Sequence, residues 1–320
     1  MEVFNKLFAA LRPEATKFTV PSFREQTEWP CGIYSFPDES VRRIYFNCAI
    51  VHWRGTDWLI TRQMVRQYGL DISSLAAWEL KDNVPGAKYP IGIQKYFMAE
   101  QHEDPRAFIF KDKIVVACCN FIQQRTFAHQ IIGTLSDNFA MRQPVHLEFG
   151  KNRAAGIQRN KGHEKNWTWF VHDGAPHFVY RPVPHLVCRF EGKVTAKYKD
   201  YRRNVDWKWG DIRGGTCPER VGDEYISFFH SSLPINDGAS RRYYMGAYAF
   251  EAKPPFRITR YTRFPMLVGS EADKGTKPVV FPCGSIFRNG EWLVVGGLND
   301  WKCFWLRIPH EDLEGRLVKA

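Results

Sequence analysis

The chain has 320 residues, 44% of them hydrophobic, so it can bury a large core as one all-β domain or as two smaller domains. Its 24 Gly, 19 Pro, 11 Trp and 24 Phe favour short strands and turns over long helices. The net charge of +11 is dispersed along the chain, which excludes a basic arm and indicates an anionic partner such as a phosphate, a nucleotide, a nucleic acid or an acidic glycan.

The cysteines and the N-terminus indicate the compartment. No two of the eight cysteines have Cys-x-x-Cys spacing, and most lie in apolar runs where a free thiol behaves as a small hydrophobe. We therefore expect reduced cysteines and a cytoplasmic location. Residues 1–13 lack the long apolar stretch of a secretory signal, and no run reaches the ~20 apolar residues that span a bilayer. Because no His/Cys cluster is present, we predict no metal site and no cofactor.

After a lead-in of residues 1–43, a β-hairpin is predicted. The apolar run 44–53 reaches a Gly-containing turn and returns at 58–62. Asn47 and Arg62 fall at strand positions where a polar side chain needs a partner or a polar cavity. Residues 65–100 are interpreted as an insertion that contributes rim loops.

The second hairpin opens with the charged cluster His102-Glu103-Asp104-Pro105-Arg106. Two apolar runs follow the cluster and are separated by a Lys-Asp-Lys turn. Taken alone, these five residues fit a solvated turn with an ion pair as well as they fit a site. Similar polar clusters open four other hairpin-like segments, which favours a site.

Three further units occupy residues 162–190, 213–250 and 279–300. One residue near the start of each of the five units can serve as an anchor, and successive anchors are 57, 61, 48 and 68 residues apart: Asn47, Asp104, Lys165, Arg213 and Phe281. A repeat of this length with several strands is typical of a propeller blade, whose first strand lies innermost. We therefore predict an all-β fold, a five-bladed β-propeller, with residues 44–320 as one catalytic domain. The polar strand starts would then converge at one end of the central channel.

Nine short motifs follow one another along the five units: Phe46-Asn47 with Arg62, Glu103-Asp104-Pro105-Arg106, Lys165-Asn166, Tyr180-Arg181-Pro182, Arg213-Gly214-Gly215-Thr216, Phe229-His230, Tyr244-Met245-Gly246-Ala247, Val280-Phe281-Pro282-Cys283-Gly284 and Gly297-Leu298-Asn299-Asp300. This ordered set resembles that of glycoside hydrolase family 130, whose members are five-bladed propellers that phosphorolyse or hydrolyse β-mannosides. The forms Glu-Lys-Asn-Trp and Arg-Gly-Gly-Thr are also similar to β-mannosyltransferases built on a related propeller.

The resemblance implies that Asp104 is the catalytic acid. Cleaving or making a glycosidic bond with inversion needs a proton at one oxygen and an attacking group on the opposite face of the sugar. In the family an aspartate supplies this proton through a sugar hydroxyl. Such a carboxyl needs a raised pKa, which Glu103 would favour and Arg106 would oppose. The alternative is a structural carboxylate that caps a hairpin, and Arg106 is interpreted as the orienting partner of Asp104.

The resemblance also implies a phosphate site. Lys165 matches a phosphate-side lysine of the family, and Arg181 matches the arginine of a His-Arg-Pro motif, whose histidine is Tyr180 in this chain. A Lys and an Arg suit a phosphate dianion. The replacement by Tyr180 leaves hydrolysis, or transfer from a nucleotide sugar, open. Four arginines are candidates for two further phosphate contacts of the family: Arg125, Arg142, Arg153 and Arg159.

The remaining motif positions are predicted to bind sugar through hydrogen bonds, although each alone is more often structural. They are Asn47, Arg62, Glu103, Arg106, Asn166, Arg213, His230, Tyr244 and Asp300. Neighbouring aromatic rings are expected to stack on pyranose faces: Trp167, Trp169, Tyr244 and Trp301.

Three functional classes therefore compete. The first is an enzyme that transfers a mannosyl-like group between a phosphate-bearing donor (a sugar phosphate or nucleotide sugar, or inorganic phosphate in reverse) and a sugar hydroxyl. The second is a hydrolase that uses water, with Glu219 or Asp300 as the base. The third is a non-catalytic propeller that binds glycan or nucleic acid, for which the net charge is the separate support. The sequence leaves the sugar and a homo-oligomeric assembly open.

Overall fold

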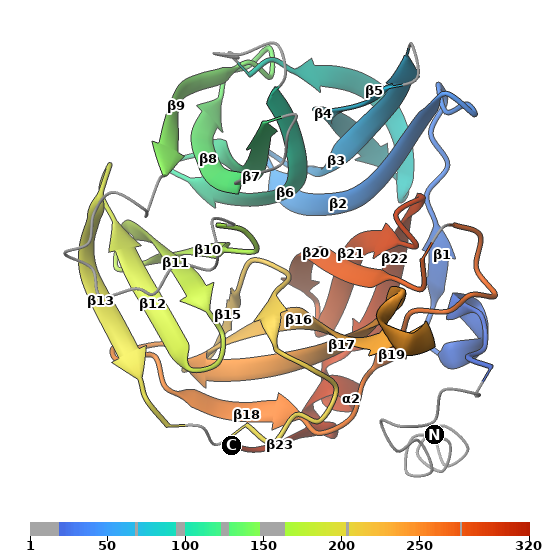
Figure 1. Cartoon of the computed structure of the whole chain (residues 1–320). Coiled ribbons are helices and arrows are strands. Elements are labelled where there is room, and N and C mark those ends of the chain that lie inside the picture. Colours follow the sequence, from blue (N-terminus) through green and yellow to red (C-terminus); the bar gives the residue numbers. More distant parts are fainter. Residues whose placement is uncertain are drawn as a thin grey trace.

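The computed structural model describes residues 19–67, 70–93, 100–122, 128–147, 164–202, 205–275 and 277–320. These residues form an all-β structure in which antiparallel sheets are arranged around a common centre, as in a β-propeller (Figure 1). Within them, five separate sheets are present, and we number these sheets in chain order. No helix in these ranges is long and apolar enough to cross a membrane.

The first two sheets are simple four-stranded meanders, in which each strand pairs with the next one along the chain. Their hairpin turns contain residues with positive φ, such as Arg54 and Gly55, which match the twist of the flanking strands. The first sheet consists of β2 (Arg43–Trp53), β3 (Thr56–Gln67), β4 (Leu70–Lys81) and β5 (Val84–Ile91). The second consists of β6 (Glu100–Phe110), β7 (Lys113–Ile122), β8 (Ala128–Leu135) and β9 (Met141–Leu147).

The third and fourth sheets differ in regularity. The third is a meander of β10 (Thr168–His172), β11 (Ala175–Arg181), β12 (His185–Phe190) and β13 (Val194–Asp200). The fourth is seven-stranded, because two further strands pair with each of its two long strands and the C-terminal strand joins its edge. Its strands are β14 (Arg213–Gly214), β15 (Glu219–Val221), β16 (Glu224–Ile235), β17 (Ser240–Glu251), β18 (Ile258–Thr262), β19 (Leu267–Val268) and β23 (Leu317–Lys319), with η3 (Asn236–Gly238) joining β16 to β17.

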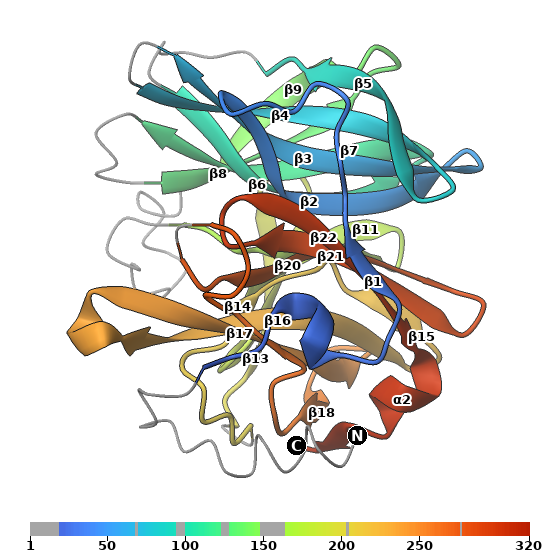
Figure 2. The same cartoon turned by 90° about the vertical axis from the view of Figure 1, so that its right-hand side faces the viewer.

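The fifth sheet joins the two ends of the chain. Its strands β20 (Val280–Arg288), β21 (Glu291–Leu298) and β22 (Lys302–Pro309) are followed by α2 (His310–Glu314), and its outer strand is β1 (Cys31–Ile33) from the lead-in. β1 lies beside β22, with Cys31 opposite Leu306 (Figure 2). Pairing the N-terminal strand with the C-terminal strands closes the ring of sheets, so the lead-in is part of the β-structure.

Residues 65–100 are not the predicted insertion. The described part of this stretch ends β3 and forms β4 and β5, which complete the first sheet. Sequence analysis missed them because the run 70–81 mixes Ser, Asp and Glu with its apolar residues. β4 lies between β3 and β5 and buries only part of its residues, so it tolerates such a mixture and the alternation is weak.

The first strand of each sheet lies nearest the centre of the ring: β2, β6, β10, β14 with β15, and β20 (Figure 1). β2 contacts both β6 and β20, and β15 contacts β20. Four of the five predicted anchors lie on these inner strands, and Lys165 lies three residues before β10. The predicted anchors therefore lie on or directly before the inner strands.

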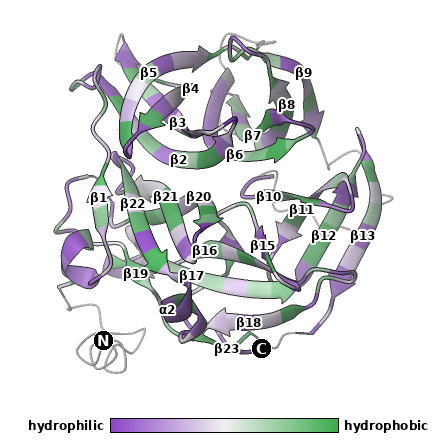
Figure 3. Cartoon of the chain, turned by 180° about the vertical axis from the view of Figure 1, so that it is seen from behind, coloured by the Kyte–Doolittle hydropathy of each residue, from purple (hydrophilic) through white to green (hydrophobic). Residues whose placement is uncertain are grey.

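The sheets pack face to face through apolar side chains, and Figure 3 shows hydrophobic and hydrophilic residues mixed along the strands. Trp167 stacks on Phe178 and Trp169 packs against the same ring at a tilt of 39°, with ring centroids 4.7 Å apart in both pairs. The two tryptophans are only 1% and 0% exposed. The expectation that they stack on a sugar is therefore wrong, because their faces are covered by the core.

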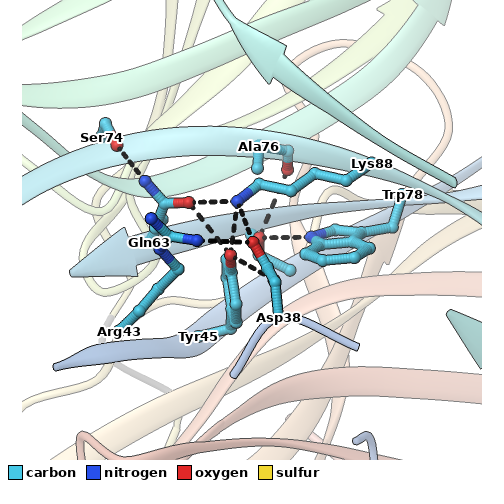
Figure 4. Close-up of polar contacts among 9 residues, drawn as sticks. Asp38, Arg43, Tyr45, Gln63, Ser74, Ala76, Trp78 and Lys88 are labelled. Atoms are coloured by element: carbon cyan, nitrogen blue, oxygen red, sulfur yellow. Dashed lines mark hydrogen bonds and ion pairs between the residues drawn. The ribbon is translucent and has the colours of Figure 1, made fainter. Parts of the chain in front are cut away.

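The lead-in is also tied to the first sheet by a polar network (Figure 4). The Lys88 ammonium donates to Asp38 Oδ2 at 2.7 Å and to Gln63 Oε1 at 2.6 Å. The Tyr45 hydroxyl donates to Asp38 Oδ1 at 2.7 Å. Burial acts to raise the pKa of Asp38, but the hydrogen bonds from Lys88, Tyr45 and Arg43 outweigh it and lower this pKa. The network fixes residue 38 beside the sheet that the chain enters next.

Candidate active site

Two β-bulges at the inner ends of the first and second sheets create the polar centre. The pairing register shifts between Phe46 and Ala49 in β2 and between Glu103 and Arg106 in β6. Asn47 and Asp104 lie in these bulges, each with φ of 52°. Asn and Asp tolerate this left-handed conformation better than other residues that carry a side chain. The bulges therefore turn an amide and a carboxylate toward each other.

The Asp104 carboxylate is held through one of its oxygens. Asn47 Nδ2 donates to Asp104 Oδ1 at 2.7 Å, and Arg62 Nη1 lies 3.4 Å from the same oxygen. Arg62 Nη2 donates to Glu103 Oε1 at 2.6 Å, so one guanidinium joins the two neighbouring carboxylates. Asp104 Oδ2 has no hydrogen-bond partner within the described ranges, and the side chain is 22% exposed. Asp104 thus has one fixed oxygen and one oxygen available to a ligand.

Glycine makes this arrangement sterically feasible. A Cβ atom on Gly297 of β21 would lie 1.7 Å from Asn47 Oδ1. Any larger residue there would displace the amide that holds Asp104.

Arg106 does not orient the Asp104 carboxylate, contrary to the sequence-based interpretation. Its Nη1 donates to the backbone carbonyls of Asp104 at 3.2 Å and Pro105 at 3.1 Å. The guanidinium lies over the Phe281 ring, 5.2 Å from its centroid. The bulge shifts the register after Glu103, which places Arg62 of the neighbouring strand against the carboxylates instead. Arg106 is 2% exposed, and its Nε and Nη2 atoms are unpartnered among the described residues.

Asp300 belongs to the same centre. Burial raises its pKa and the Asp104 carboxylate raises it further, whereas Arg62, Lys277 and Lys165 act in the opposite direction. Lys277 Nζ lies 3.9 Å from Asp300 Oδ2. The Asp300 carboxyl group therefore interacts with four other charged groups, which come from separate parts of the chain: Asp104, Arg62, Lys277 and Lys165.

His230 forms an apolar wall of the site with a polar edge. Its ring packs on Phe281 at 4.3 Å and on Tyr243 at 5.8 Å between centroids. Burial lowers the pKa of His230 well below its usual value, and Arg213, Arg106 and Lys165 lower it further. His230 Nδ1 has no hydrogen-bond partner among the described residues. A neutral imidazole with a buried free nitrogen suits a contact with a ligand hydroxyl.

Tyr243, and not Tyr244, faces this centre. Burial raises the pKa of Tyr243, with Asp300 and Asp104 adding to the rise and Arg213 opposing it. Tyr244 packs on Trp209 with centroids 5.2 Å apart and is 8% exposed. Successive side chains of a strand point to opposite faces, so the predicted residue is displaced by one position along β17.

The predicted phosphate side lies at the start of the third sheet. Lys165 is exposed, and its charge acts on Asp300 and His230. Asn166 has φ of 64°, and Gly214 of the next sheet approaches its carbonyl so closely that a Cβ there would lie 2.2 Å away. Arg181, at the end of β11, is exposed.

The Tyr180 hydroxyl, which was predicted to contact phosphate, contacts a carboxyl group of the protein. Its hydroxyl donates to Glu164 Oε1 at 3.2 Å. Burial raises the pKa of Glu164, and the hydrogen bond from Tyr180 counteracts this in part. No cation contacts the Glu164 side chain within the described ranges, which favours its neutral form.

The candidates for further phosphate contacts fall elsewhere. Arg142 lines a cavity that it shares with the hairpin turns at Lys111 and Gly174, away from the Asp104 centre. Arg125, Arg153 and Arg159 lie outside the described residues. Glu219, a predicted base, is the first residue of β15. It lies opposite Ile226 of β16, whereas Arg213 lies opposite His230, four positions further along the same strand. Burial alone raises the pKa of Glu219 to about 7.

Asn299 is a residue that sequence analysis missed. Its Nδ2 donates to the carbonyls of Ser270 at 2.8 Å and Asp273 at 2.9 Å, and its Oδ1 accepts from the backbone N–H of Val279 at 2.8 Å. It therefore fixes the loop that carries Lys277 next to Asp300. Its place in a Gly-Leu-Asn-Asp motif was visible, but the three backbone partners are distant in sequence. Tyr243 was missed because a strand pattern alone does not say which face meets the site.

The described residues provide neither a metal site nor a disulfide. No group of three His, Cys, Asp or Glu side chains in the described ranges has the geometry to hold a metal ion. The eight cysteines are free, and seven of them are buried.

Known proteins share this fold. No protein-family model matches the sequence, and no curated protein matches it. A β-1,2-mannobiose phosphorylase from Listeria innocua is 13% identical, with 88% of this chain and 94% of that chain covered and a TM-score of 0.64. MPT-4, a mannose phosphorylase from Leishmania mexicana, is 12% identical, with 93% and 94% covered and a TM-score of 0.57.

A third structure belongs to work on the GH130 family of mannoside phosphorylases, which contains glycoside hydrolases that target β-1,2-mannosidic linkages in Candida mannan. It is 14% identical, with 92% of this chain and 97% of that chain covered and a TM-score of 0.63. These likenesses extend over nearly the whole chain. At the level of fold, the resemblance to the propellers of glycoside hydrolase family 130 is therefore confirmed.

Proposed function

We propose that the protein is a glycosyl-transferring enzyme of the family 130 type that acts on β-mannosides. It moves a mannosyl-like group with inversion between a phosphate-bearing donor and a sugar hydroxyl, and each of its five sheets is one propeller blade. The observation that carries the proposal is the Asp104 carboxylate, fixed through Oδ1 by Asn47 and Arg62 and free at Oδ2.

This carboxylate can act in both directions of the reaction. In phosphorolysis, Asp104 donates a proton toward the glycosidic oxygen through a sugar hydroxyl while phosphate attacks the anomeric carbon from the opposite face. In synthesis, phosphate leaves and Asp104 accepts the proton of the acceptor hydroxyl. A carboxylate that is held through one oxygen keeps the other oriented for this transfer, which reduces the entropy cost of the step.

The cations of the site supply the phosphate-side chemistry. Lys165 and Arg213 both act on His230, so their charges converge at the centre. Neither cation forms an ion pair with a carboxylate of the described residues. Unpaired cations next to a sugar site would stabilise the charge of a phosphoryl group during attack or departure.

Hydrolysis is the second candidate, and Glu164 is the observation that favours it. A glutamate of raised pKa beside Lys165 places a carboxyl where the family binds phosphate. When ionised, this group would repel a phosphate dianion and would accept a proton from water.

Product analysis separates these reactions. The protein is incubated with a β-1,2-mannobiose in the presence and absence of inorganic phosphate, and with mannose 1-phosphate or a nucleoside diphosphate mannose plus a panel of sugar acceptors. Mannose 1-phosphate formed from mannobiose, or a new disaccharide formed from a phosphate-bearing donor, supports the proposal. Free mannose formed at the same rate without phosphate supports hydrolysis.

Asp104→Asn tests the acid directly. The amide retains the shape of the carboxylate but cannot carry the transferred proton, so we expect turnover to fall by at least about 1,000-fold with substrate affinity largely retained. Asp71→Asn, in an exposed pair with Arg66, is the control and should leave turnover unchanged. Full turnover by Asp104→Asn would remove Asp104 from this role. A wild-type protein that binds glycans but converts none of these substrates would favour the non-catalytic propeller.

A further inference from the structure

A cavity of about 420 Å³ lies between the second and third sheets. It is bordered by the hairpin turns at Lys111 and Gly174, so it lies at the opposite ends of β6 and β10 from the polar centre around Asp104. Its volume falls within the roughly 300 to 1,000 Å³ of small-molecule sites. The cavity is separate from the proposed reaction site, so a ligand could occupy it whether or not the proposed function is correct.

The floor of the cavity is apolar. Aromatic and aliphatic side chains from both sheets line it: Phe108, Phe110, Val115, Ile132, Val145 and Phe190. Phe108 is 7% exposed and stacks on Trp169 with parallel rings 6.0 Å apart, so the floor is rigid. A rigid apolar floor favours an occupant with a hydrocarbon body over a sugar.

A β-bulge borders the cavity on one side, and two glycines lie on the other side. The register between β8 and β9 shifts between Ile132 and Thr134, opposite Arg142 and Val145. Within this bulge Gln143, which lines the cavity, has φ of 47°, an unfavourable conformation for a residue with a long side chain. On the other side, a Cβ atom on Gly174 or Gly192 would meet no atom within 4 Å.

The rim of the cavity carries unneutralised positive charge. Lys111 and Arg142 both line it and are exposed, and neither has a carboxylate partner within the described ranges. The third charged residue at the rim, Glu191, is paired with Arg189 at 2.8 Å. Two free cations above an apolar floor are complementary to a molecule with one anionic end.

We propose that this cavity binds an amphipathic carboxylate of the medium-chain fatty-acid type. The carboxylate lies at the rim against Arg142 and Lys111, and the acyl chain fills the space over Phe108 and Phe190. The cavity holds the equivalent of about fourteen water molecules at ~30 Å³ each, which suits a chain of this size better than a two-chain lipid. A planar guanidinium is well suited to bidentate contact with the carboxylate.

Binding of decanoate tests the proposal, with 1-decanol as the uncharged analogue. Both are titrated into the full chain by isothermal calorimetry and by displacement of the fluorescent anion 8-anilinonaphthalene-1-sulfonate. We expect saturable binding of decanoate to one site, and binding of decanol at least about tenfold weaker because it lacks the charge. Equal affinities for the two, or no saturable binding of decanoate, would overturn the proposal.

Two variants locate the site. Arg142→Gln removes one cation and should weaken decanoate binding roughly tenfold while leaving decanol unchanged. Thr134→Phe fills the cavity from β8 and should abolish binding of both compounds. Lys113→Gln is the matched control, because Lys113 is exposed on the same hairpin as Lys111 but does not line the cavity.

The two variants differ in their risk to folding. If Thr134→Phe lowers the melting temperature, the charge variant still measures the site without changing the core. Unchanged decanoate affinity in Arg142→Gln, or a loss of equal size in Lys113→Gln, would show that binding occurs elsewhere.

Discussion

Two pairs of carboxyl groups lie on or next to inner strands of the ring, and their surroundings differ. In the first and second sheets, Glu103 and Asp104 are both held by Arg62, and Asn47 adds a second donor to Asp104. On the side of the third and fourth sheets, Glu164 has only the Tyr180 hydroxyl as a side-chain partner, and Glu219 has no side-chain partner, within the described ranges. Burial raises the pKa of both Glu164 and Glu219.

This difference divides the centre into two halves. In the half formed by the first and second sheets, which we call the committed half, the cation is paired with carboxylates. In the other half, the cations form no ion pair within the described ranges. A buried charge needs a partner, and Arg62 serves as the partner of both Glu103 and Asp104. Where the carboxyls stay neutral, no cation is needed to compensate them. Lys165 and Arg213 therefore keep their charge available for a bound anion.

The largest expected effect comes from removing the shared cation. Arg62→Gln removes the guanidinium that neutralises Glu103, whose side chain is 7% exposed. We expect the free energy of unfolding to fall by about 3 kcal/mol, and turnover to fall by about 100-fold because Asp104 loses a positioning contact. Urea denaturation and product formation measure the two effects.

Arg66→Gln is the matched control for this variant. Arg66 lies on the same strand β3 and pairs with Asp71 at 2.8 Å, but its side chain is 65% exposed. The loss should be below about 1 kcal/mol, as for other surface pairs. Similar losses in Arg62→Gln and Arg66→Gln would contradict the assignment of Arg62 to the committed half.

The second prediction concerns Glu219 and pH. The pKa of Glu219 rises from its ordinary value of 4.5 to about 7 in the folded protein. Below pH 4.5 the group is protonated in both states and costs nothing. As the pH rises from 4.5 through 7, the unfolded state releases this proton before the folded state does, so folding stability is lost.

Glu219→Gln should therefore be more stable than the wild type by on the order of 2 kcal/mol at pH 8, and equal to it near pH 4. Denaturation at the two pH values measures this difference. Glu311→Gln, at an exposed position of α2, should show no such pH dependence. A stability difference that is the same at both pH values would mean that the fold does not raise the pKa of Glu219.

The smallest expected effect lies on the phosphate side. Glu164→Gln removes the fraction of negative charge next to Lys165, so we expect the KM for a phosphate-bearing donor to fall by roughly three- to tenfold at pH 8. The pH dependence has a definite sign: because its pKa is raised, Glu164 is neutral at low pH, so the wild type and the variant should converge as the pH falls. Steady-state kinetics at pH 5 and pH 8 test this.

A large loss of turnover in Glu164→Gln would contradict the view that Glu164 only weakens phosphate binding. If Glu164→Gln loses turnover by 100-fold and the wild-type product is free mannose, Glu164 is a base for water and the second candidate function is correct. Tyr180→Phe separates the two, because it removes only the hydroxyl that contacts Glu164 at 3.2 Å.

Much of the fold was accessible from the sequence because hairpins are local. Apolar runs of strand length separated by turns containing Gly, Asn or Asp predicted the all-β class, and the spacing of the anchors predicted the ring. The strands β4 and β5 and the pairing of β1 with β22 were missed. Partial burial hides the first two. The third pairs Cys31 with Leu306, 275 positions along the chain (306 − 31), which no local pattern records.

For the site, the sequence by itself determined which residue types gather at the inner strand starts: Asn47, Glu103, Asp104, Lys165, Arg213, His230 and Asp300. Only the tertiary structure decided their contacts. Because of a one-residue bulge in β6, the Glu103 and Asp104 carboxylates contact Arg62, and Arg106 donates to backbone carbonyls instead. The two faces of β17 put Tyr243 in place of Tyr244. Register and face depend on pairing between strands, and this pairing is fixed by packing around the whole ring.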